Sequence, residues 1–107
     1  INSKVSPAIV MGISGQLDKL VDCELVARQP IPIIKRFSGG GTVVVDEGTF
    51  FTTFICNEAC TGAGCFPEKV HSWVEPLFRA LFDRPDFSLR ENDYVFGDRK
   101  FGGNAQY

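Results

Sequence analysis

Two cations, a hydroxyl and three consecutive glycines stand together in the segment Lys35-Arg36-Phe37-Ser38-Gly39-Gly40-Gly41-Thr42. Glycines lack a Cβ, so their backbone reaches positive φ and their N–H groups can approach a ligand closely. That freedom is costly between two apolar strands, and a plain hairpin needs only a dipeptide such as Asn-Gly. The segment therefore predicts a glycine-bearing hairpin that binds an anion or another tightly held ligand.

The common nucleotide-binding motifs do not fit this segment. No Lys-Ser/Thr pair follows the glycines as in a P-loop, and Val44 stands where a dinucleotide fingerprint has its third glycine. The β-branched run 42–45 favours a strand after the turn. A phosphate here would therefore be held by loop amides and side chains, without a helix dipole.

A second glycine-rich segment lies near the end of the chain and reads Gly97-Asp98-Arg99-Lys100-Phe101-Gly102-Gly103-Asn104-Ala105-Gln106. Lys100 follows a turn and begins a strand, so its ammonium could point into a cleft. A lone lysine in such a place is usually solvated. Two segments of this kind in a short chain predict one site to which both contribute.

The elements that must position these residues can be read from the hydrophobic pattern. Apolar and β-branched runs predict strands at 8–13, 33–34, 42–45, 49–56, 87–89 and 94–96. A hairpin turn is expected at 46–48, and at least part of 16–28 has helical spacing. Pro67 begins a predicted helix to Phe82, which Pro76 should kink or divide. This order predicts a mixed α/β (α+β) fold with a largely antiparallel sheet and helices packed on it.

Composition limits the classes of function. The chain has 107 residues, 44% of them hydrophobic, which suits one core and a single domain over 1–107. A net charge of −2 leaves no basic footprint, so nucleic acid is not an expected partner. No apolar run approaches the ~20 residues of a membrane span, so a membrane is not expected either. An intracellular protein is expected, with cytoplasm, mitochondrion and plastid left open.

The remaining reactive side chains point to packing rather than chemistry. Four are cysteines: Cys23, Cys56, Cys60 and Cys65. Their spacing is a poor match to paired zinc ligands, and no secretory context favours disulfides, so reduced structural thiols and no metal site are expected. His71 lies in the predicted helix and is expected to be a partly exposed packing residue. Trp73 and the phenylalanines are expected in the core.

The two glycine segments, in this order, resemble the paired motifs of the lipoate–protein ligase A branch of the biotin/lipoate ligase superfamily. Residues 35–43 resemble Arg-Arg-x-Ser-Gly-Gly-Gly-(Ala/Thr)-Val, and residues 97–106 resemble Gly-(Asp)-(Arg)-Lys-(Ile/Phe)-x-Gly-(Ser/Asn)-Ala-Gln, where Asp and Arg vary. The segment Pro7-Ala8-Ile9-Val10-Met11-Gly12 resembles the strand that precedes them in the family. The Gly-Arg-Gly-Arg loop of biotin ligases and the Thr-Tyr-His-Gly-Pro-Gly of octanoyltransferases are absent, which favours the ligase branch.

The resemblance implies a biotin/lipoate ligase-like catalytic domain, of which this chain is expected to be an incomplete front part or an unusually short version. It implies that ATP, with Mg²⁺, activates lipoate or octanoate to an acyl-adenylate. The acyl group would then pass to a lysine of a lipoyl domain, on a 2-oxoacid dehydrogenase E2 or a glycine-cleavage H protein. Fixed cations and loop amides would stabilise the charge that develops on oxygen.

The resemblance also assigns residues to this chemistry. Lys100 would be catalytic, bridging the acyl carbonyl and the phosphate, and Arg36 would lie near the phosphate or the acyl chain. The other substrate- and adenylate-binding residues would be Ser38, Gly39, Gly40, Gly41, Thr42, Gly103, Asn104 and Ala105. Two alternatives stay open: a lipoyltransferase that uses preformed lipoyl-AMP, and a non-catalytic relative that acts as a binding module.

Overall fold

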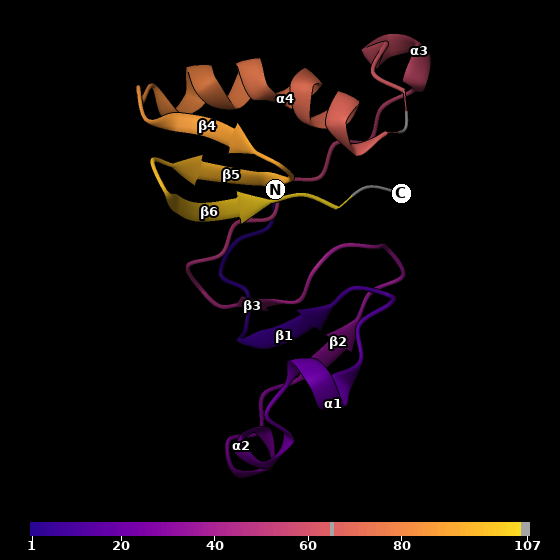
Figure 1. Cartoon of the computed structure of the whole chain (residues 1–107), viewed down its shortest axis with the longest axis vertical. Helices are drawn as coiled ribbons and strands as arrows, with labels where there is room; N and C mark the ends of the chain where they lie inside the picture. Colours follow the sequence, from indigo (N-terminus) through magenta and orange to yellow (C-terminus); the bar gives the residue numbers. More distant parts are fainter. Residues whose placement is uncertain (65, 106–107) are drawn as a thin grey trace. The chain divides into compact units, whose positions relative to one another are not determined.

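The computed structural model describes residues 1–64 and 66–105, in two compact units, Ile1–Phe54 and Ile55–Tyr107. The first unit contains β1 (Ala8–Met11), α1 (Leu17–Leu20), α2 (Cys23–Arg28), β2 (Ile33–Lys35) and β3 (Val43–Val45) (Figure 1). The second contains α3 (Glu58–Thr61), α4 (Pro67–Phe82), β4 (Phe87–Arg90), β5 (Asp93–Phe96) and β6 (Arg99–Gly103). Cys65 of the predicted cysteine set and Gln106 of the second glycine motif lie outside the described residues.

The first unit is built on a three-stranded sheet in the order β2-β1-β3 (Figure 1). β1 pairs with β2 in parallel, with Ile9 opposite Ile33, and with β3 in antiparallel fashion, with Val10 opposite Val43. The central strand is also the most buried one, since three of its four residues lie in the core. Val45 of β3 is buried with them.

This strand order corrects the prediction that the first glycine segment forms a hairpin. β2 and β3 do not pair with each other, because β1 lies between them. The chain leaves β2 on one side of β1, crosses the end of that strand and enters β3 on the other side. The glycines therefore form a crossing loop between β2 and β3. Its form depends on the pairing of both strands with β1, which lies more than twenty residues earlier in the chain.

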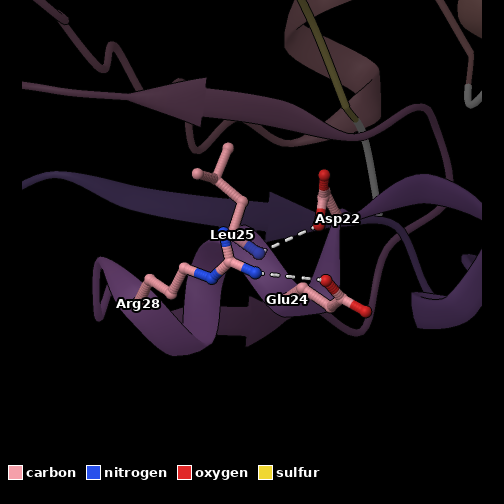
Figure 2. A network of polar contacts seen from close by, with 4 residues as sticks. All are labelled: Asp22, Glu24, Leu25 and Arg28. Carbon is pink, nitrogen blue, oxygen red and sulfur yellow. Dashed lines mark hydrogen bonds and ion pairs between the residues drawn. The ribbon is translucent and has the colours of Figure 1, made fainter.

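The helical pattern of 16–28 is confirmed, as two short helices. α2 begins after Asp22, whose side chain accepts a hydrogen bond from the Leu25 N–H at 2.9 Å (Figure 2). This hydrogen bond makes Asp22 a regular N-cap, so α2 begins directly after the break that follows α1. Figure 2 also shows Arg28 paired with Glu24 one turn apart, at 3.4 Å. Both side chains are largely exposed, so this pair contributes little to stability.

The predicted strand over 49–56 is wrong, so residues 46–48 form a turn but not the predicted hairpin. The carboxylate of Asp46 accepts from the Gly48 N–H at 2.9 Å, and the Thr49 N–H donates to the Asp46 carbonyl at 3.0 Å. Among the described residues, the following segment makes only an isolated bridge, between Phe51 and Asn2. A β-branched and aromatic run favours extended backbone, but a strand also needs a neighbouring edge with which to pair.

The second unit packs α4 against an antiparallel sheet in the order β4-β5-β6 (Figure 1). Pro67 is the first residue of α4, as predicted, but the helix is not divided at Pro76 and runs to Phe82. One missing backbone hydrogen bond is tolerated because the helix face is held by packing. The core consists of Val74, Phe87 and Tyr94, with Phe78, Phe82, Leu89 and Phe96 against it. Three of the four strand pairings described are antiparallel, so the predicted fold class is confirmed.

Three predictions about side chains need correction. Trp73 is 38% exposed and several phenylalanines are more exposed still, among them Phe37 and Phe50, although all were expected in the core. His71 is only 2% exposed and belongs to the buried face of α4, whereas partial exposure was expected. The cysteines that the structure describes are free thiols on the surface, so they do not act as packing residues: Cys23, Cys56 and Cys60. Over the described helices, none has the length and apolarity needed to cross a membrane.

Candidate functional site

One edge of the first sheet gathers the glycines and cations of the first glycine segment. β1 and β2 are parallel, so their carboxyl ends meet at the same edge. Gly12 follows β1 there and Arg36 follows β2. Because β3 is antiparallel to β1, Thr42 leads into it from the same edge. The topology thus brings three separate segments to one place.

Hydrogen bonds fasten the glycine loop, residues 38–42, to the exit of β1. The Ile13 N–H donates to the Ser38 carbonyl at 3.0 Å, and the Arg36 N–H donates to the Met11 carbonyl at 2.9 Å. On the outer side, Lys35 Nζ donates to the Gly15 carbonyl at 3.2 Å. The loop is therefore fixed at its start and does not hang free from the sheet.

The guanidinium of Arg36 organises the glycine loop from within. Nη2 donates to the carbonyl oxygens of Gly39, at 2.7 Å, and Gly41, at 2.9 Å, and Nε adds a second bond to Gly39 at 3.2 Å. Gly40, between them, has a φ of 97°. The carbonyls of Gly39 and Gly41 thus face the guanidinium. In the described structure, the N–H groups of Gly39 and Gly40 have no partner within the protein. These N–H groups can bind a ligand oxygen.

Gly12 makes this arrangement possible. It is buried, and a Cβ built at Gly12 would collide with the carbonyl oxygen of Gly40 and lie 3.4 Å from Nη2 of Arg36. The crossing loop can therefore pass over the end of β1 only because that strand is followed by a residue without a side chain. Sequence reasoning did not assign Gly12 to the site, although the residue stands in the family-like segment 7–12.

An apolar cavity of about 430 Å³ lies beside the glycine loop within the first unit. Its walls come from α1, α2, the strands and the connection before β2: Ile9, Leu20, Val21, Asp22, Leu25, Val26, Gln29, Ile31, Thr42, Val43 and Val44. Thr42 belongs both to the loop and to the cavity wall. Its hydroxyl is buried and, among the described residues, has no hydrogen-bond partner. A polar loop thus borders an apolar space of a size that suits a small molecule.

In the second unit, Lys100 lies in β6 and forms an ion pair with Asp93 of β5. Its Nζ is 2.6 Å from the Asp93 Oδ1, and the lysine side chain remains 51% exposed. The register places Val95 opposite Lys100 but Tyr94 opposite Gly102, so β6 carries an extra residue, Phe101, at this point. Bulges of this kind turn a side chain away from its regular direction. Sequence reasoning missed Asp93, because cross-strand partners depend on register.

The other motif residues of the second unit follow Lys100 closely. Gly103 ends β6, and Asn104 and Ala105 come directly after it. Nδ2 of Asn104 donates to the hydroxyl oxygen of Tyr94 at 3.4 Å. Burial raises the pKa of the Tyr94 phenol, and the hydrogen bond from Asn104 lowers it in part. Tyr94 is a second contact that the sequence did not reveal.

In the part of the chain that the structure describes, no group of three or more His, Cys, Asp or Glu side chains could hold a metal ion. Magnesium usually enters nucleotide sites on the phosphates and keeps several waters, so such a cluster is not needed for an ATP-dependent reaction.

The described residues thus combine a glycine loop at the carboxyl edge of the first sheet with a lysine in a glycine-rich hairpin of the second unit. The family profile of the lipoyl protein ligase A/B catalytic domain matches residues 3–107. The chain belongs to this family. The predicted family and fold class are thereby confirmed.

Two relatives illustrate the range within this family. The lipoate–protein ligase LplJ of Bacillus subtilis (strain 168) is 30% identical over 104 residues, which cover 94% of this chain. The inactive lipoate–protein ligase 2 of Plasmodium falciparum (isolate 3D7) is 23% identical over 114 residues, which cover 84% of this chain. The chain spans about 30% of the length of each of these relatives.

Proposed function

We propose that this chain contributes to a lipoate–protein ligase that activates lipoate or octanoate with ATP and transfers the acyl group to a lysine of a lipoyl domain. The observation that carries the proposal is the junction at Thr42, where an apolar cavity of about 430 Å³ meets the glycine loop. A fatty acid has this same division, an apolar chain ending in a charged head. The family match over residues 3–107 supports one catalytic domain.

In the first unit, the loop would bind the head of the acyl group and its phosphate. The N–H groups of Gly39 and Gly40 have no partner among the described residues and would donate to the ligand oxygens. Preorganised donors of this kind stabilise charge on oxygen without having to reorganise during the reaction. Ser38 and Thr42 complete the loop, and the apolar chain would occupy the cavity behind Thr42. Arg36 would then act mainly by holding the loop.

In the second unit, Lys100 would be the catalytic cation, with Gly103, Asn104 and Ala105 on the nucleotide side. Its ammonium is half exposed and already carries one anionic partner, Asp93. An ammonium fixed in this way can bind a phosphate or acyl oxygen with its remaining hydrogens. This assignment is supported by the match of residues 97–105 to the family motif.

The chemistry has two steps. The carboxylate oxygen of lipoate attacks the α-phosphorus of ATP, and the bond to pyrophosphate breaks. The neutral amine of the acceptor lysine then attacks the acyl carbon, the bond to the phosphate oxygen breaks, AMP leaves with the electron pair, and the nitrogen loses its proton to water. Negative charge accumulates on phosphate and carbonyl oxygens in both steps, which is where Lys100 and the loop amides would act. No side chain is required as a general base in this account, which relies on positioning.

ATP–pyrophosphate exchange in the presence of lipoate tests the proposal. Lipoate-dependent exchange that is lost in Lys100→Ala supports a ligase. Transfer from synthetic lipoyl-AMP without exchange would instead identify a lipoyltransferase. Absence of both activities, with no binding of lipoyl-AMP, would contradict the proposal.

A non-catalytic binding module is the second candidate, because one relative carries the name of an inactive ligase. The two glycine segments are present in this chain, which favours binding but does not by itself provide turnover. Tight binding of lipoyl-AMP without exchange or transfer would select this candidate.

A further inference from the structure

Tyr94 occupies a position that the proposed chemistry does not explain. Its ring is buried, with 6% exposure, in the core between α4 and the sheet of the second unit. The ring of Phe78 meets it edge-on at 4.9 Å, and His71 lies 5.4 Å away. Phenylalanine would satisfy these contacts equally well. A buried hydroxyl costs free energy unless it is hydrogen-bonded, so the phenol oxygen requires its own reason.

The hydroxyl of Tyr94 reaches the residue that follows β6. Nδ2 of Asn104 donates to it at 3.4 Å. Between the two, the ring covers Gly102, where a Cβ would lie 3.2 Å from the ring carbon Cδ2. The glycine at 102 and the tyrosine at 94 therefore fit each other, and they sit opposite one another in the register of β5 and β6.

We propose that Tyr94 is a positioning residue that orients the carboxamide of Asn104 toward the nucleotide part of an acyl-adenylate. The inference rests on the proposed function. Aromatic packing fixes the ring, the ring fixes the phenol oxygen, and the phenol oxygen fixes the plane of the Asn104 amide. A carboxamide held in this way offers an acceptor and a donor in defined directions. Such a pair suits the ribose hydroxyls or the adenine edge of the ligand.

A double-mutant cycle on the intact protein tests this inference. The variants are Tyr94→Phe, Asn104→Ala and their combination, and the probe is a non-hydrolysable lipoyl-adenylate in which a sulfamate replaces the phosphate. Each single change should weaken binding by about threefold to tenfold, the range for one neutral hydrogen bond. The double variant should bind no worse than Asn104→Ala alone, because both changes remove the same interaction.

Val74→Ala is the matched control, since Val74 belongs to the same core and takes no part in the hydrogen bond between Asn104 and Tyr94. Val74→Ala should lower the Tm and leave the affinity of the folded protein unchanged. Tyr94→Phe should weaken the affinity and leave the Tm nearly unchanged. Wild-type affinity in Tyr94→Phe, or additive losses in the double variant, would overturn the inference while the proposed function stands. Failure of the wild-type protein to bind the probe would overturn the proposed function, and this inference with it.

Discussion

The carbonyl oxygen of Gly40 occupies the space that a side chain at Gly12 would need. The loop therefore crosses the end of β1 at backbone distance, and Gly12→Ala must push the two apart. We expect this substitution to cost about 1–3 kcal/mol of unfolding free energy, as overpacking in a tight interior does. Thermal or denaturant unfolding measures the loss.

Gly39→Ala is the matched control for this prediction. It lies in the same loop, but a Cβ there would meet no atom within 4 Å. Its stability should stay within about 0.5 kcal/mol of wild type, as for other surface substitutions. Equal stability of the two alanine variants would show that the loop does not press on Gly12.

Arg36→Lys should loosen the glycine loop. The guanidinium binds the carbonyls of Gly39 and Gly41 at the same time through a planar array of donors. A lysine ammonium is a single point and cannot reproduce this geometry. Amide hydrogen exchange should become faster at Ile13 and at position 36, whose N–H groups tie the loop to β1, and lipoyl-AMP affinity should fall. Arg28→Lys, on the exposed face of α2, should change neither; unchanged exchange in Arg36→Lys would contradict the structural role.

The sequence predicted the parts of the fold that depend on local pattern. The helix from Pro67 to Phe82, the strand from Ala8 and the turn at Asp46 all follow from neighbouring residues, and the structure contains each of them. The crossing loop was not predictable in this way. Its form depends on β1 entering between β2 and β3, which is a long-range pairing that no local pattern of the glycine segment encodes.

The burial of His71 was missed for a different reason. α4 carries two apolar stripes, and spacing alone does not say which of them the sheet covers. The covered stripe includes Val74 and Phe78, and His71 belongs to it. The other stripe includes Leu77 and Leu81, which are 51% and 67% exposed. The partners of the motif residues, Asp93 and Tyr94, were missed because the bulge in β6 sets the register.

His71→Leu should leave the fold as stable as wild type or make it more stable. The imidazole is buried, and in the described part of the chain neither ring nitrogen has a hydrogen-bond partner. Replacing an unsatisfied polar group by an apolar one of similar size removes a desolvation cost. The Tm of His71→Leu should not fall, whereas Val74→Ala should lose about 1.5–3 kcal/mol. A large loss in His71→Leu would show that the ring nitrogens are hydrogen-bonded.

Asp93→Asn should weaken ligand binding or turnover while leaving the stability of the second unit almost unchanged. The carboxylate holds the ammonium of Lys100 at 2.6 Å, and both side chains are partly exposed. Exposed pairs contribute less than about 1 kcal/mol, so the Tm should change little. Turnover or lipoyl-AMP binding should fall by about tenfold because the ammonium loses its orientation. Asp86→Asn, which breaks the similar pair with Arg84, should leave binding unchanged. Equal binding by both variants would contradict a positioning role for Asp93.

The titration of Tyr94 provides a pH-dependent test of its burial and of its bond to Asn104. Burial raises the pKa of this phenol above the ordinary value of 10.0. As the pH rises past that value, the unfolded chain loses the phenol proton while the folded protein keeps it. The stability is therefore complete below about pH 10 and falls as the pH rises toward the folded-state pKa. Tyr94→Phe should remove this part of the alkaline loss.

Asn104→Ala should raise the pKa of Tyr94, whereas exposing the phenol to solvent would lower it. The hydrogen bond from Asn104 lowers the pKa of Tyr94 against the larger effect of burial. Its removal should therefore raise the pKa further and steepen the loss of stability at high pH. Site-resolved NMR of the labelled tyrosine ring measures the midpoint directly in each variant. A lower midpoint in Asn104→Ala would mean that solvent reaches the phenol when the carboxamide is removed, and an unchanged midpoint would mean that the two groups do not interact.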